Sequence, residues 1–157
     1  MGESKERILD GMGLRIAIVY SEYNQSIVHS LFRGAMDGLS TCKVSNEDIF
    51  YRSVPGAFEI PLAVKNECAN PSLEKHYDAI IALGCVIRGA TSHYDLICNE
   101  VTRSLMSISL EFNVPILHGI LTTENIAQAK ERSGEKMNNK GYECALSAVE
   151  MGLMTWQ

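Results

Sequence analysis

The sequence lacks the short motifs that mark the common nucleotide-binding and metal-binding classes. It has no Gly-x-Gly-x-x-Gly or Walker pattern, so nucleotide cofactors gain no support, and no Cys-x-x-Cys pair. Its five cysteines are scattered through apolar segments, which predicts reduced packing residues rather than disulfides. Cys85, His93 and Cys98 match no common zinc spacing, so no metal site is predicted.

Basic charge and long apolar runs are also scarce. There are 14 Lys and Arg against 19 Asp and Glu, a net charge of −5, so neither nucleic acid nor an anionic membrane is a predicted partner. No apolar run approaches the ~18 residues of a membrane span. The start "MGESKERILDG" is too charged for a secretory signal. We therefore expect a cytoplasmic protein.

Short apolar runs alternate with helical patterns four times along the 157 residues, as in stacked βαβ units. The pattern predicts one α/β domain over residues 14–157, preceded by an arm over 1–13. The expected fold is a three-layer αβα sandwich, flavodoxin-like, with a four-stranded parallel sheet and right-handed crossovers. Strands are predicted at 14–20, 47–54, 77–87 and 114–121, and helices over about 28–39, 57–69, 94–112, 124–133 and 142–156.

Three local features refine this prediction. Pro61 should lie in the first turn of its helix, where a missing N–H costs little. Thr123 is the expected N-cap of the following helix. Residues 5–10, "KERILD", are too short to pack alone and are candidates to extend a sheet edge, that of a neighbouring subunit included.

Ligands of open parallel sheets bind beyond the carboxyl ends of the strands. Polar segments fall there at 21–24, 55–59, 85–95 and 118–124. In "CVIRGATSHYD" (85–95), Gly89 and Ala90 leave backbone N–H groups approachable and Thr91 and Ser92 precede a helix, which suits an anion such as phosphate. The alternative is that Thr91 or Ser92 only caps that helix.

His93 is the group of this loop best suited to move protons near neutral pH, although a structural role stays open. Arg132 and Glu59 also have two interpretations. Each is a candidate site residue, and each fits a charge that only complements a helix end.

Four longer segments, taken together, resemble the lumazine synthase family: "VPGAFEIP", "GCVIRGATSHYD", "GILTTENIAQAKERSG" and "NKGYECALSAVEM". The likeness runs in one order from about Leu14 to Met151. It implies condensation of 5-amino-6-(D-ribitylamino)uracil with 3,4-dihydroxy-2-butanone 4-phosphate to give 6,7-dimethyl-8-ribityllumazine, phosphate and water. No metal or organic cofactor is implied.

The resemblance also implies roles for individual residues. His93 would transfer protons, and Ala90, Thr91 and Arg132 would hold the phosphate. Lys140 would reach the pyrimidine. The family usually has Phe or Trp in place of Tyr23, and commonly Phe in place of His118, whose imidazole could stack, donate a hydrogen bond or shift the pH optimum. The uracil and its ribityl chain would contact Tyr23, Ala57, Phe58, Glu59, Cys85, Val86, Ile87 and His118.

Assembly is implied as well, because the family builds its sites between adjacent subunits of a pentamer, with His93 of one subunit facing Arg132 of the next. The linker "GEKMNN" is as short as in relatives that form a shell of 60 subunits, which leaves a shell open. The alternative function is a catalytically weak carrier or shell protein that binds lumazine or flavin compounds. A flavodoxin-like redox protein fits less well, because "SEYNQS" replaces the expected hydroxyl-rich loop.

Overall fold

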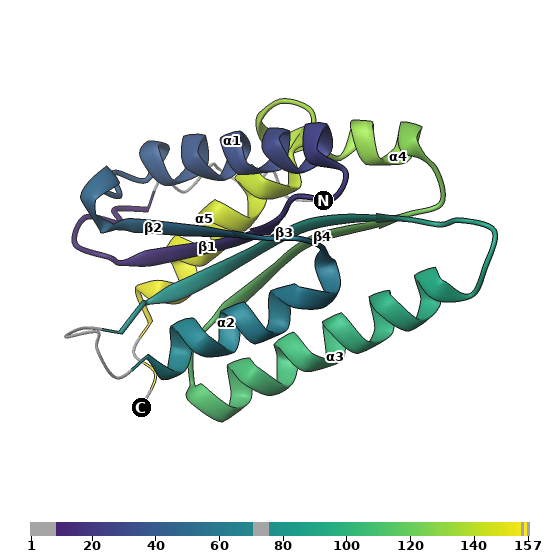
Figure 1. Cartoon of the computed structure of the whole chain (residues 1–157). Helices are drawn as coiled ribbons and strands as arrows, with labels where there is room; N and C mark the ends of the chain where they lie inside the picture. The colour runs from purple at the N-terminus through teal and green to yellow at the C-terminus, as the bar shows by residue number, and fades with distance from the viewer. Residues whose placement is uncertain (1–8, 71–75, 155, 157) are drawn as a thin grey trace, which may run out of the picture.

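A four-stranded parallel sheet forms the centre of the molecule (Figure 1). The structure is a computed structural model that describes residues 9–70, 76–154 and 156. Within them the strand order is β2-β1-β3-β4, and every pairing is parallel. The predicted sheet is thereby confirmed. The strands are β1 (Ile16–Ser21), β2 (Ile49–Val54), β3 (Ala79–Ile87) and β4 (Ile116–Thr123).

Helices cover both faces of this sheet, which confirms the predicted three layers. In Figure 1, α1 and α5 lie over one face, and α2 and α3 over the other. The helices are α1 (Gln25–Thr41), α2 (Ile60–Ala69), α3 (His93–Phe112), α4 (Ile126–Glu131) and α5 (Lys140–Gly152). Short 3-10 turns occur at Asn46–Asp48, Ala57–Glu59 and Lys136–Asn138.

The two central strands are apolar except for Tyr20 and Ser21 at the end of β1, because helices bury both of their faces. All of β3 from Ala79 to Cys85 is buried, and alternate residues enter opposite cores. Ile81 packs beneath α1 and α5, whereas Ile80 packs with the apolar residues of α2 and α3. The sheet therefore holds the carboxyl ends of β1 and β3 on a rigid base.

The helix α1 packs closely on α5 through a glycine. A Cβ atom at Gly38 would lie 2.6 Å from Cβ of Ala145 and 2.9 Å from the carbonyl oxygen of Tyr142. Only glycine lets the two helices approach to this distance. Of the six residues predicted to face the core from α1, Phe32 and Met36 are half-buried and the other four are fully buried, namely Val28, Leu31, Ala35 and Leu39.

Several predicted boundaries need correction. Thr123 does not cap α4; it is the last residue of β4 and pairs with Ile87. Because β4 continues this far, the cap falls to Asn125, whose Oδ1 accepts from the backbone N–H of Gln128 at 2.9 Å. The helix α4 is also shorter than predicted. Pro61 is the second residue of α2, as expected, whereas Ala57–Glu59 forms a separate 3-10 turn.

The five cysteines are free; four are buried and Cys98 is half-buried, which confirms them as packing residues. Residues 1–8 lie outside the described part of the chain, and so does most of the segment 5–10 proposed to join a sheet edge. Gly11, in the predicted arm, donates its N–H to the carbonyl of Cys42 at 2.7 Å. Among the described residues, no helix is long and apolar enough to cross a membrane.

Candidate functional site

A cavity of about 720 Å³ opens at the carboxyl ends of β1, β2 and β3. Three of the four polar segments singled out in the sequence surround it. The segment 118–124 does not, because β4 lies at the other edge of the sheet. The described lining residues are Tyr23, Asn24, Gly56, Ala57, Phe58, Glu59, Cys85, Val86, Ile87, Gly89, Thr91, His93, Tyr94 and Ile97.

Backbone hydrogen bonds tie the loop after β1 to its neighbours. The N–H of Tyr23 donates to the carbonyl of Pro55 at 3.1 Å. Asn24 adopts a left-handed conformation (φ 58°), which asparagine tolerates, and its side-chain amide donates to the carbonyl of Cys85 at 2.9 Å. Sequence reasoning missed Asn24, although an asparagine directly before a helix is the signal that could have found it.

Two large aromatic side chains on the cavity wall are exposed to solvent. Tyr23 is 73% exposed and Phe58 is 65% exposed. Aromatic faces lining a concave site offer apolar area that a flat ring can cover. Gly56 and Ala57, beside Phe58, are small, and the carboxylate of Glu59 adds a hydrogen-bond acceptor to this wall.

The last residues of β3, from Cys85 to Ile87, form an apolar part of the lining. Burial raises the pKa of the Cys85 thiol to about 11. The thiol is therefore neutral near pH 7 and is not a nucleophile, since nucleophilic cysteines react as thiolates. Cys85 contributes shape to the cavity rather than covalent chemistry.

The loop between β3 and α3 presents polar groups to the same cavity. The Oγ1 of Thr91 accepts from the backbone N–H of His93 at 3.3 Å, whereas Ser92, at the N-cap position, makes no such bond. A hydroxyl that accepts one hydrogen bond still has its own O–H to donate. Thr91 can therefore cap the helix and bind an anion, so the two sequence interpretations are compatible. His93 itself is exposed at the first residue of α3.

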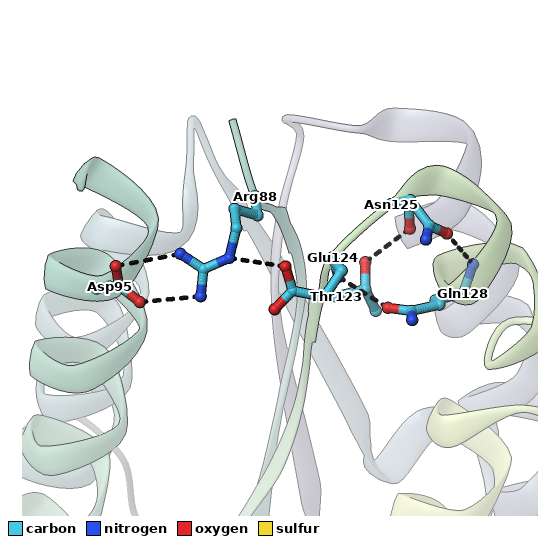
Figure 2. A network of polar contacts seen from close by, with 6 residues as sticks. All are labelled: Arg88, Asp95, Thr123, Glu124, Asn125 and Gln128. Carbon is cyan, nitrogen blue, oxygen red and sulfur yellow. Dashed lines mark hydrogen bonds and ion pairs between the residues drawn. The ribbon is translucent and has the colours of Figure 1, made fainter. Parts of the chain in front are cut away.

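The guanidinium of Arg88 lies beside this loop, but it is already paired with two carboxylates. The Nη1 and Nη2 atoms of Arg88 donate to the two oxygens of Asp95 at 3.2 and 3.1 Å, and Nε donates to Glu124 at 2.8 Å (Figure 2). The guanidinium also lies 4.3 Å from the ring centroid of Tyr94. Hydrogen bonds to Asp95 and Glu124 raise the pKa of Arg88 above its usual range.

Three predicted site residues are not among those lining the cavity of a single chain. Ala90 is exposed in the loop after β3. His118 is half-buried on β4, and its Nε2 lies 3.0 Å from Oγ1 of Thr102 on α3. Burial lowers the pKa of His118 below its usual value. Arg132 is exposed at the C-cap of α4. The roles of all three stay predictions.

The described lining contains no lysine or arginine. Its charged group is Glu59, with His93 as a titratable neighbour. Lys140, the further pyrimidine candidate, pairs with Glu143 at 3.3 Å. In the described parts of the chain, no three His, Cys, Asp or Glu side chains gather as a potential metal site.

A protein-family model described as 6,7-dimethyl-8-ribityllumazine synthase matches residues 13–155. The match spans all four strands and every candidate site residue. It confirms the resemblance drawn from the sequence motifs.

Proposed function

Because this chain belongs to the 6,7-dimethyl-8-ribityllumazine synthase family, a family of transferases of riboflavin biosynthesis, we propose that it condenses 5-amino-6-(D-ribitylamino)uracil with 3,4-dihydroxy-2-butanone 4-phosphate. The supporting observation is the single cavity at the carboxyl ends of the strands. It gathers all the residues to which the resemblance assigns roles except Ala90, His118, Arg132 and Lys140.

The cavity supplies the groups that the reaction needs. The exposed rings of Tyr23 and Phe58 would cover the flat pyrimidine, and Glu59 would accept hydrogen bonds from it or from the ribityl hydroxyls. The backbone of Gly89 and the hydroxyl of Thr91 would receive the phosphate. His93, two residues beyond Thr91, would then stand near the carbon atoms that react.

His93 would act where protons move. An amine of the pyrimidine attacks the ketone and forms an imine with loss of one water, the phosphate leaves, and the second amine closes the ring with loss of a second water. Each step transfers a proton to or from nitrogen, oxygen or carbon, and an imidazole can both accept and donate near pH 7. The products are lumazine, phosphate and two water molecules.

The turnover assay tests this function directly. Purified protein is incubated with both substrates, and the lumazine absorbance is followed; reactions lacking either substrate and a His93→Ala variant serve as controls. We expect product only with the wild-type chain and both substrates, above the uncatalysed background. Tight binding of lumazine without turnover would instead support the carrier function.

We further propose that the working unit is a homo-pentamer in which a neighbouring copy completes each site. A dianionic phosphate needs a cation, the described lining of the cavity has none, and two carboxylates engage the nearby Arg88. Arg132 is exposed and lies outside the cavity of its own chain, so its guanidinium could reach the cavity of a neighbouring copy.

The size of the native assembly gives a first test. The expected mass is five times the 17.4-kDa chain, or a multiple of that pentamer if shells form. A fully active monomer would contradict the shared site, because one chain would then hold every group the reaction requires.

A further inference from the structure

The loop that carries Thr91 and His93 has few anchors of its own. Residues 88–93 are all exposed. The backbone N–H groups of the first turn of α3 bond locally: that of His93 donates to Thr91, and those of Asp95 and Leu96 donate to Ser92. The side chain of Tyr94 adds one longer contact, a hydrogen bond to Thr122 on β4. A Cβ atom at Gly89 would meet nothing within 4 Å, so packing does not confine this stretch either.

Arg88 ties both ends of this loop to neighbouring elements. Its backbone N–H donates to the carbonyl of Thr123 at 2.9 Å, which fixes the start of the loop to the end of β4. Its guanidinium binds both oxygens of Asp95, two residues after His93 in the first turn of α3. Both ends of the loop are thus held by one residue.

The second carboxylate belongs to Glu124, which is itself held by a hydrogen bond to the first turn of α4. Its backbone N–H donates to the side chain of Gln128 at 2.8 Å, and Gln128 donates its own backbone N–H to Asn125 (Figure 2). The hydroxyl of Thr123 donates to the carbonyl of Asn125 at 3.0 Å. Figure 2 shows a continuous network that runs from α3 through Arg88 to the start of α4.

We propose that Arg88 is a positioning residue that holds His93 and the anion-binding loop in their working places by bridging Asp95 and Glu124. The proposal rests on the proposed function for what His93 does. Arg88 acts through geometry and not by touching substrate: it is not among the described lining residues of the cavity, and three of its five N–H groups and one face of its guanidinium plane are already engaged.

A guanidinium is needed for this role. Its planar fork binds both oxygens of one carboxylate while Nε binds a second, which a lysine ammonium cannot reproduce. Exposed ion pairs contribute little to global stability. Substitution of Arg88 should therefore leave the chain folded but make the loop between β3 and α3 more mobile.

The kinetic test compares Arg88→Ala, Arg88→Lys and the matched control Arg103→Ala, an exposed arginine of α3 that pairs with Glu100. Displacement of a catalytic group by about 1 Å can lower a rate by about 100-fold. We expect kcat to fall about 10- to 100-fold in Arg88→Ala and less in Arg88→Lys. In Arg88→Ala the KM for the butanone phosphate should rise, while the KM for the pyrimidine should stay near that of the wild type. Both kcat and KM of Arg103→Ala should stay near the wild-type values.

A double mutant separates positioning from a general structural effect. If Arg88 acts through His93, adding Arg88→Ala to His93→Ala should lower kcat less than about 3-fold further, because the affected group is already gone. Equal fold-losses in both backgrounds would overturn the proposal. So would a wild-type kcat in Arg88→Ala.

Amide hydrogen exchange gives a readout that needs no activity. In Arg88→Ala, the amides of residues 89–95 should exchange at least about 10-fold faster than in Arg103→Ala, while those of β1 and β3 stay protected. Unchanged exchange in this loop would overturn the positioning role even if the enzyme is active. Faster exchange in a protein that makes no lumazine would support the anchor and refute the proposed function.

Discussion

The side chain of Asn139 anchors the segment that follows Arg132. Removing this side chain should lower the free energy of unfolding by a measurable amount. The side chain is buried, 3% exposed, at the N-cap of α5. Its Oδ1 accepts from the N–H of Tyr142 at 3.1 Å, and its Nδ2 donates to the carbonyls of Ser30 and Gly134, each at 2.9 Å. It therefore joins α1, α5 and the loop after α4.

The cost of Asn139→Ala follows from these three bonds. Loss of an N-cap costs about 1 kcal/mol. Each of the two donations contributes about 1 kcal/mol net, which brings the total to about 3 kcal/mol. In a chain of this size, about 1 kcal/mol shifts Tm by roughly 2–4 °C, so we expect a fall of roughly 6–12 °C.

Urea and thermal unfolding at a fixed protein concentration measure this loss, with Asn138→Ala as the control. Asn138 is the exposed neighbour, and it bonds to Gly134 and Glu135 through its backbone, so its substitution should cost less than about 0.5 kcal/mol. Asn139→Asp keeps the cap but replaces both donations with a carboxylate oxygen that faces two carbonyl oxygens, so at least about 2 kcal/mol should be lost. An Asn139→Ala chain as stable as Asn138→Ala would refute the reasoning.

The remaining predictions concern three site residues. His93→Ala should lower kcat by ~10²–10⁴ and leave the circular dichroism spectrum and assembly size unchanged; near-native turnover would remove its proton-transfer role. Arg132→Lys should raise the KM for the butanone phosphate and leave pyrimidine binding nearly unchanged, because lysine lacks the planar fork; equal loss for both substrates would indicate a structural role. Burial lowers the pKa of His118, so the unfolded chain binds a proton more readily, and stability should fall as pH drops below about 6.5. His118→Gln should flatten that part of the pH profile of unfolding free energy, and an unchanged slope would contradict the shift.

The sheet was predictable because a strand that is buried on both faces has an almost uninterrupted run of apolar residues. The central strands β1 and β3 read as continuous apolar runs, and the predicted ranges 14–20 and 77–87 contain nearly all of their residues. Loops at the carboxyl ends of such strands must converge, so the meeting of Tyr23, Phe58 and His93 around one cavity also followed from the pattern.

Features that depend on competition between neighbours were not predictable. Thr123 and Asn125 are both good caps, and the choice depended on how far β4 pairs with β3, which composition does not encode. Arg88 appeared in the sequence as one more polar residue of a loop. Its partners Asp95 and Glu124 are 7 and 36 residues away, so the bridge becomes visible only when the chain is folded.

The shared site is tested most directly by mixing two inactive chains. His93→Ala and Arg132→Ala chains are co-assembled in equal amounts, and mixed assembly is confirmed by mass. If each site takes His93 from one copy and Arg132 from the next, random assembly in a closed ring leaves roughly one quarter of the sites intact, and about a quarter of wild-type turnover should return. Activity no higher than that of the separate variants would show that each chain carries its own complete site, and would contradict the account.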